Sequence, residues 1–129
     1  MEAADLELIA ELIVPADVEM LAVCRTTLAG VGAGLALSDV ALDDLKLVLS
    51  EVCGAAMERT GAAGGTVGIE FRTSQGEIEI SVTDRGGDTH QGGSGLGFSL
   101  LRQLCSRLDV VPRPHGPGRI VRFAQTLPA

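Results

Sequence analysis

Two alternating segments, residues 67–73 and 77–84, constrain the fold of this chain more than any other feature of its sequence. Only Ser-Gln-Gly separates them, and so short a connection favours an antiparallel hairpin. The second segment alternates apolar with polar residues: Ile78, Ile80 and Val82 against Glu77, Glu79 and Ser81. Such a sheet has one apolar face and one face that can meet water. The pair therefore predicts a two-layer fold, with helices packed on the apolar face alone.

Periodicity and breaker residues predict the remaining elements. They are a strand over 6–14 that Pro15 ends, a helix over 16–31 that glycines 30, 32 and 34 break, a helix over 38–59 capped by Ser38 or Asp39, a third helix with Phe98, Leu101, Leu104, Cys105 and Leu108 on one side, and strands over 109–111 and 119–126. The predicted fold class is α+β: a two-layer α/β sandwich, with a mixed sheet of about five strands and three helices on one face. We expect residues 1–129 to form one domain, since no linker or repeat interrupts them.

Composition excludes several function classes. The hydrophobic content of 46% is too high for a disordered chain, and the three phenylalanines are the only aromatic residues. An aliphatic core is therefore expected, and base stacking on aromatic platforms is not. The net charge of −7 argues against direct binding to nucleic-acid phosphates. The same charge is consistent with a basic protein partner, and it is explained equally well by the need for solubility.

The cysteines and the length of the apolar runs indicate where the protein works. Cys24, Cys53 and Cys105 form no CxxC pair, and each falls in a helical apolar pattern. Without a signal peptide, we expect reduced thiols in the core of a cytoplasmic protein. No apolar run approaches the roughly 18 residues of a membrane span, so no membrane association is predicted.

A glycine-rich loop over 84–97 lies between a predicted strand and a predicted helix. Its six glycines let the backbone approach a ligand closely, and the following helix N-terminus suits an anion such as phosphate, although an ordinary turn has the same composition. Neither the GxxxxGK[ST] nor the GxGxxG spacing is present. Asp84, at the end of the strand, could accept a hydrogen bond from the exocyclic amine of adenine or could simply be a turn aspartate.

Other polar residues are compatible with a catalytic or metal-binding role, but their pattern alone does not specify one. Glu51 lies on the helical face opposite the apolar stripe, together with Leu47, Ala55 and Glu58, where it is either a general base or a solvated glutamate. His90 and His115 are too far apart to form a metal motif, and we expect both in exposed loops. Arg102 and Arg107 are expected on the solvated face of the third helix.

Four segments, in this order, resemble the bacterial anti-sigma-factor serine kinases. They are IVPADVEMLAVCRTTL, DDLKLVLSEVCGAAMERTG, ISVTDRGGD and GSGLGFSLLRQLCSRLDV. These kinases belong to the histidine-kinase-like (GHKL, Bergerat-fold) ATPase superfamily, and the resemblance covers about residues 6–127. Each motif is weak by itself, and the ordered set is specific.

The resemblance implies a role for particular residues. Glu51 matches the catalytic glutamate that prepares a serine of the partner for phosphorylation, and Asp84 with Gly86 matches the adenine-binding first glycine box. The second glycine box, which holds phosphates, is matched by Gly95, Leu96 and Gly97. Arg25 matches a first-helix arginine in the region where such proteins meet partners and each other. ATP and Mg²⁺ are the cofactors that the family implies.

Three departures from the family pattern lie on the phosphate and metal side of the site. Ala55 stands where the family has a Mg²⁺-binding asparagine, and a methyl group cannot ligate this ion. Asp88 replaces the last glycine of the first box, where it could repel phosphate or act as a distant metal ligand. Arg119 replaces a threonine before the last strand, which removes a hydroxyl but adds a positive charge.

These departures favour an anti-sigma switch protein that binds a sigma factor or an anti-anti-sigma partner, with nucleotide binding weak or lost. The alternative is an active ATP-dependent protein-serine kinase that phosphorylates its antagonist, and a third possibility is a docking domain without any link to nucleotide. Met20, Val23 and Thr27 form an apolar strip on the first predicted helix. This strip suits either a homodimer or the sigma factor.

Overall fold

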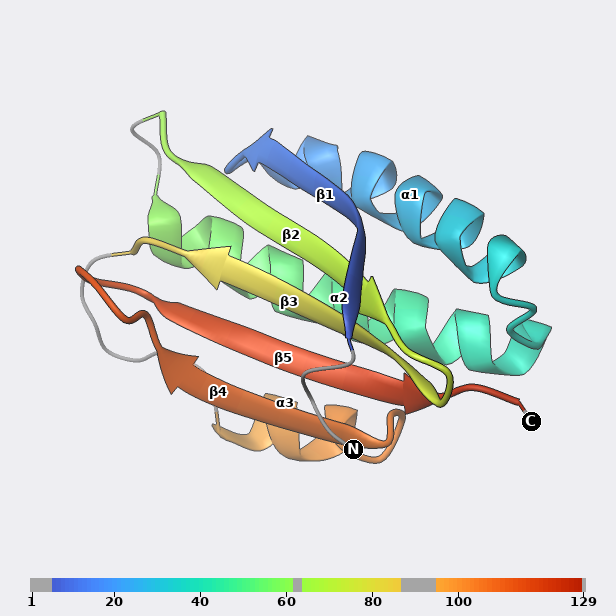
Figure 1. The fold of residues 1–129 in the computed structure, drawn as a ribbon. Helices are drawn as coiled ribbons and strands as arrows, with labels where there is room; N and C mark the ends of the chain where they lie inside the picture. Colours follow the sequence, from blue (N-terminus) through green and yellow to red (C-terminus); the bar gives the residue numbers. More distant parts are fainter. Residues whose placement is uncertain (1–5, 62–63, 87–94, 129) are drawn as a thin grey trace.

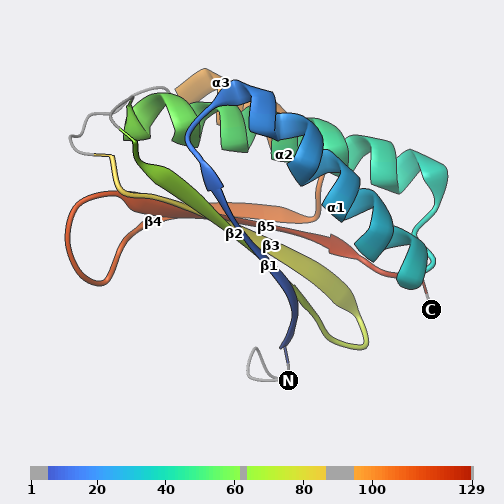
Figure 2. The same ribbon diagram turned by 90° about the horizontal axis from the view of Figure 1, so that it is seen from above.

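The computed structural model describes residues 6–61, 64–86 and 95–128, with side chains at 95–97 left aside. The described residues form eight helices and strands, labelled in Figure 1, and one short 3₁₀ turn. They are β1 (Glu7–Pro15), the 3₁₀ turn η2 (Val18–Met20), α1 (Leu21–Gly34), α2 (Asp39–Thr60), β2 (Thr66–Thr73), β3 (Glu77–Asp84), α3 (Gly95–Leu101), β4 (Arg107–Pro112) and β5 (Arg119–Thr126). All three helices lie on one side of the sheet, as Figure 2 shows, which confirms the predicted two-layer α+β architecture.

The strands form one sheet in the order β1-β2-β3-β5-β4, and every neighbouring pair is antiparallel. The predicted mixed sheet is therefore wrong. The reason is that α1 and α2 cross the sheet in opposite directions, so that β2 returns antiparallel to β1. The crossover through α3 does make β4 parallel to β3, but β5 lies between these two strands and pairs with both.

The core lies between the sheet and the helices, and it is aliphatic apart from its phenylalanines. The inward face of β3 contributes Ile78, Ile80 and Val82, as the alternation predicts. The predicted apolar stripe of α2 is also buried and consists of Leu45, Val48, Leu49, Val52, Cys53 and Ala56. Cys24 and Cys53 are fully buried, whereas Cys105 is partly exposed in the turn after α3 and does not lie in a helix.

Helix α1 does not end at its first glycine but continues through Gly30 and Gly32 to Gly34. Gly32 is buried against the first turn of α2 and the segment before it, and a Cβ atom there would lie 2.9 Å from Leu42 Cδ1. A glycine at this position therefore permits close packing of α1 on that segment, and the packing outweighs the low helix propensity of glycine.

Helix α3 is shorter than predicted, because it ends at Leu101 and Leu108 already belongs to β4. Arg107 also lies in β4 instead of on a solvated helix face. Its guanidinium donates to Glu77 Oε2 at 2.7 Å and to Glu79 Oε2 at 3.3 Å on the open face of the sheet. Glu79 is consequently only 8% exposed, although this face was expected to meet water.

Candidate functional site

Helix α2 presents Glu51 and Ala55 on its outer face. Ser38 starts the helix, since its Oγ accepts a hydrogen bond from the N–H of Ala41 at 3.1 Å, which confirms the predicted cap. Because the opposite stripe of α2 is buried on the sheet, Glu51 is exposed and Ala55, one turn later, is half-buried. Glu51 forms no ion pair with another described residue, and its exposed side chain can meet solvent.

A groove of about 380 Å³ separates this face of α2 from α3 and the turn that follows it. Its lining consists of Leu47, Glu51, Ala55, Phe98, Leu100, Leu101 and Leu104. Among the described residues of this lining, Glu51 is the single ionisable one. The described lining is thus apolar apart from one carboxylate.

Asp84 is the second element of the candidate site, and it is 1% exposed at the end of β3. Its Oδ2 accepts a hydrogen bond from Arg59 Nε at 3.1 Å, and its Oδ1 accepts one from the N–H of Gly86 at 3.1 Å. Arg119 Nε lies 3.6 Å from the same Oδ2. We refer to Arg59, Asp84 and Arg119 as the Asp84 cluster, which joins the last turn of α2 to β3 and β5.

Two glycines allow the backbone to assemble the Asp84 cluster. A Cβ atom on Gly86 would lie 2.5 Å from the carbonyl oxygen of Arg59, so a larger residue would push β3 away from the end of α2. Gly118 has a φ of +106°, and a Cβ atom there would lie 2.0 Å from the carbonyl oxygen of Asp84. The cluster therefore depends on close backbone contact as well as on charge.

Arg119 is held between a carboxylate and an aromatic ring. Its Cζ lies 5.4 Å from the centroid of the Phe98 ring, a geometry suited to a cation–π interaction. Burial and the nearby Arg59 guanidinium lower the pKa of Arg119, while Asp84 opposes that effect. Within the described part of the chain, Arg119 Nε is buried without a hydrogen-bond partner. The cluster thus places two cations around one carboxylate.

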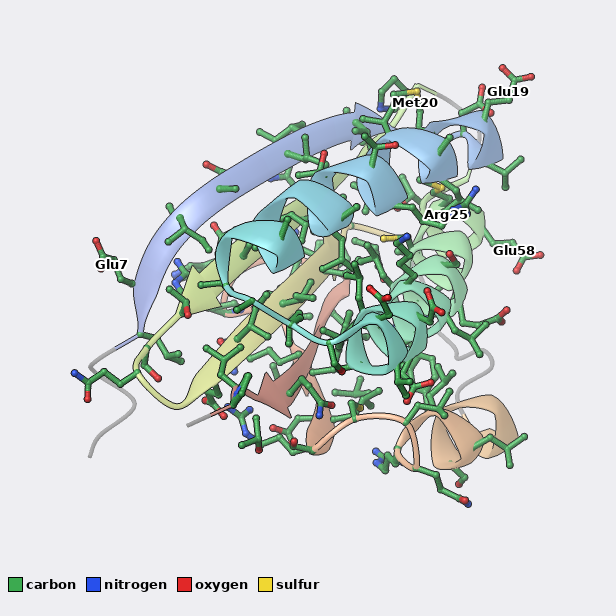
Figure 3. The ribbon with its side chains drawn as sticks, turned by 90° about the vertical axis from the view of Figure 1, so that its right-hand side faces the viewer. Glu7, Glu19, Met20, Arg25 and Glu58 are labelled. Carbon is green, nitrogen blue, oxygen red and sulfur yellow. The ribbon has the colours of Figure 1, made fainter. Side chains whose placement is uncertain are left out.

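Arg25 lies apart from both the groove and the Asp84 cluster. Its Nη1 donates to Ser50 Oγ at 3.2 Å, so the side chain connects α1 to α2, and Figure 3 shows it between these helices. Ser50 precedes Glu51 in the chain but faces another direction on the helix. The structure therefore brings together Glu51 with Ala55, and Asp84 with Gly86, while Arg25 lies between α1 and α2.

The remaining predicted residues have different outcomes. Gly95, Leu96 and Gly97 form the first turn of α3, where the resemblance expects a phosphate-binding box. Asp88 and His90 lie outside the described residues. His115 is exposed in the turn between β4 and β5, as expected. Among the residues that the structure describes, no group of three histidine, cysteine or acidic side chains could hold a metal ion.

The described residues of the site do not fit Mg²⁺-ATP as the resemblance implies it. Ala55 supplies no oxygen to a metal. Each oxygen of Asp84 already accepts a hydrogen bond, and one of them also faces a second guanidinium group. An adenine amine would have to displace these charged donors. Among the described residues, the surface beside Ala55 is rich in leucine.

Sequence reasoning missed Arg59 and the exposed leucine of α3, Leu100. A basic residue in the last turn of a helix is commonplace and points to no partner 25 residues away. Leu100 lies outside the apolar side predicted for the third helix. Its exposure indicates a binding surface only together with the exposure of Leu47. The roles of both residues depend on contacts with elements that are distant in the sequence.

The described residues form one sheet with three helices on a single face, and a glycine-rich segment connects β3 to α3. A family model described as the histidine kinase-like ATPase domain matches residues 14–124. Since this match covers most of the chain, the protein belongs to that family.

No described helix combines the length and the apolar character that a membrane span requires.

Individual relatives agree with the family assignment. The chain is 33% identical over 76 residues to the serine-protein kinase RsbW of Halalkalibacterium halodurans, covering 59% of this chain and 47% of that protein. It is 32% identical over 78 residues to the RsbW of Bacillus subtilis, covering 59% of this chain and 49% of that one. The chain thus spans about half the length of these relatives, and the predicted resemblance to the serine kinases is confirmed.

The fold also matches a solved structure. The RsbU and RsbW domains of a Mycobacterium tuberculosis protein superpose on this chain with a TM-score of 0.73 and 18% sequence identity. The match covers 93% of this chain and 32% of that one. At this identity the likeness establishes the fold alone.

Proposed function

We propose that this protein is an anti-sigma-type switch that acts by binding a protein partner, with adenine-nucleotide binding weak or lost. The partner would be a sigma factor, an anti-anti-sigma protein, or each in turn. The relationship to RsbW proteins supports the partner class. The observation that carries the loss of nucleotide binding is the Asp84 cluster, because it engages the carboxylate on which adenine recognition would depend.

The energetics of the Asp84 cluster oppose adenine binding. A hydrogen bond to a charged group contributes roughly 1.5–3 kcal/mol, whereas one between neutral groups contributes about 1 kcal/mol. An adenine amine that replaced Arg59 at Asp84 would exchange the first kind for the second. It would also leave Arg59, whose side chain is 16% exposed, with an unpaired buried charge.

Ala55 weakens the phosphate side of the site independently. Phosphoryl transfer relies on a metal ion and on positioned donors to neutralise the charge that develops on the phosphate. A methyl group at this position provides neither. Glu51 would then be a base without a reaction to serve, although its carboxylate is exposed and available.

An active serine kinase is the second candidate function. Glu51, which matches the family's catalytic base, is retained in this chain, and the relatives are named serine-protein kinases. On this alternative, the Asp84 cluster would have to open when nucleotide enters.

Calorimetry distinguishes the two candidates. The protein is titrated with ATP alone and with ATP plus Mg²⁺, and we expect no measurable heat of binding in either titration. In parallel, the protein is mixed with candidate sigma and anti-anti-sigma proteins with and without Mg²⁺-ATP, and a complex should form equally well in both. Tight Mg²⁺-dependent binding together with labelled phosphate on a partner serine would establish the kinase instead.

A further inference from the structure

We propose that the groove between α2 and α3 docks an amphipathic helix of the partner, with apolar side chains in the groove and basic side chains along α2. This inference rests on the proposed binding function and names the surface and the chemistry that would carry it. It also gives a functional reason for Ala55, the residue that departs most from the family pattern.

The apolar character of the groove is the first observation. Leu47 of α2 is 49% exposed and Leu100 of α3 is 67% exposed, and both line the groove. Phe98 and Leu101, which are 5% and 6% exposed, form its inner wall. Exposed leucines that face one concave surface from two elements indicate a binding site for an apolar ligand, whereas isolated exposed leucines carry no such meaning.

Ala55 completes the apolar lining. An asparagine at this position would place an amide in the groove, and covering that amide with a hydrocarbon side chain would cost free energy. Alanine instead adds a methyl group to the lining. The same substitution that removes a metal ligand therefore makes the groove suitable for leucine or isoleucine side chains.

Charge defines the rest of the partner. Asp44, Glu51 and Glu58 recur at intervals of seven residues along α2 and thus share one helical face, about 10 Å apart. Figure 3 shows Glu58 projecting from α2 on the side away from the sheet. None of the three forms an ion pair with another described residue. A partner with lysine or arginine along one edge would complement this row.

The local backbone favours a helix over an extended strand as the occupant. The groove lies between helices whose N–H and C=O groups are largely bonded internally, so an extended strand would find few main-chain partners there. The free edges of the sheet belong to β1 and β4. A second copy of this chain is disfavoured in the groove, since its net charge of −7 would meet the same acidic row.

The test is an NMR titration of the isotope-labelled protein with a designed peptide. The peptide is a helix of lysine, alanine and leucine, about 14 residues long to match the row from Asp44 to Glu58, with leucines at i, i+4 and i+7. We expect amide shifts at Leu47, Ala55, Leu100 and Leu101. Replacing its lysines by glutamates, or its leucines by alanines, should abolish these shifts.

Two variants test the groove against a matched control. Leu100→Asp should weaken peptide binding at least about tenfold, a change that corresponds to 1.4 kcal/mol. Ile13→Asp introduces the same charge at a residue of β1 that is 69% exposed and outside the groove. It should leave binding within twofold. If Leu100→Asp disturbs folding, as judged from the dispersion of its own spectrum, Leu47→Gln replaces it with the same expectation.

The outcomes separate this inference from the proposed function. No shifts at millimolar peptide, shifts confined to α1 or to the open face of the sheet, or equal binding of the glutamate peptide would each overturn the groove proposal. Groove shifts on concentrating the protein alone would overturn it in favour of self-association. Groove shifts with Mg²⁺-ATP would instead contradict the proposed function, and the peptide titration would still decide what else the groove accepts.

Discussion

Asp84 is surrounded at the end of β3 by two guanidinium groups and one backbone N–H. Its burial makes these contacts strong, because little water competes for the carboxylate or screens the charges. The same burial makes the cluster sensitive, since removing one member leaves the others charged and desolvated.

Asp84→Asn should destabilise the protein strongly. The amide would leave Arg59 and Arg119 without a counter-ion in a buried site, and breaking a buried ion pair in this way typically costs about 3–5 kcal/mol. Urea unfolding followed by circular dichroism measures the change. Asp109→Asn is the control, since this side chain is 57% exposed on β4, and it should have no measurable effect. Equal stability of the two variants would mean that Asp84 has no structural role.

Ala55→Asn by itself should not restore Mg²⁺-dependent ATP binding, because Asp84 stays engaged by Arg59 and Arg119. Combining it with Arg119→Thr returns a metal ligand, removes one of the two guanidinium groups and restores a hydroxyl. Calorimetry should therefore show more Mg²⁺-ATP affinity for the double variant than the two single variants predict together. Tight binding by the Ala55→Asn variant alone would show that the Asp84 cluster does not oppose nucleotide binding.

Among the elements, helices α1 and α2 are stabilised by different interactions. Helix α2 has a side-chain cap at its first turn and a continuous buried stripe. Helix α1 begins without a side-chain cap and contains Gly30, Gly32 and Gly34. Its stability therefore comes from packing against α2 and the segment leading into it, not from its intrinsic propensity.

Ser38→Ala should destabilise the protein by about 1 kcal/mol, because the N–H of Ala41 loses its acceptor. Thermal unfolding at a fixed pH measures this change. Ser38→Asp retains an acceptor at the cap and should preserve the stability. If both variants lose stability equally, the hydrogen bond is not what stabilises the start of α2.

The glycines of α1 provide a matched pair of substitutions. Gly30→Ala meets nothing within 4 Å and should stabilise α1 by up to about 1 kcal/mol through helix propensity. Gly32→Ala places its Cβ 2.9 Å from Leu42 Cδ1 and 3.3 Å from Leu37 Cδ1. It should gain less, or lose stability, because these leucines must move. Urea midpoints in the reverse order would show that α1 does not pack closely at Gly32.

At the scale of the whole molecule, the helical layer presents two distinct candidate surfaces. One is the acidic, leucine-lined groove between α2 and α3. The other is the uncharged strip of Met20, Val23 and Thr27 on and just before α1, close to Arg25. The two surfaces use different chemistry, so one protein could bind a partner through the groove and associate with itself through α1.

We expect self-association through the α1 strip, because Val23 is 41% exposed there and its burial would favour a dimer. Sedimentation velocity over a range of concentrations should show a dimer that Val23→Asp weakens. Val40→Asp, which alters a distant exposed valine, should leave it unchanged. A clean monomer of the unmodified protein at high micromolar concentration would contradict this expectation.

Local patterns predicted most of the secondary structure correctly. The alternation in β3, the stripe and cap of α2, and the extent of β5 follow from interactions between residues near in sequence. Side-chain direction repeats every two residues in a strand and every 3.6 in a helix, so burial on one face is visible in the sequence itself. The ordered motifs likewise predicted the family, since they preserve the residues that build this fold.

The tertiary structure alone decided the strand order, the early end of α3, and the fate of Asp84. No local pattern places β5 between β3 and β4, because strand order depends on contacts between distant segments. Nor does any pattern direct Arg59 to a carboxylate 25 residues away or close Arg119 over Phe98. Ion pairs and grooves of this kind arise only when packing brings separate elements together. Local patterns therefore predict a histidine-kinase-like fold, and long-range packing places the carboxylate expected to bind adenine beside the protein's own arginines.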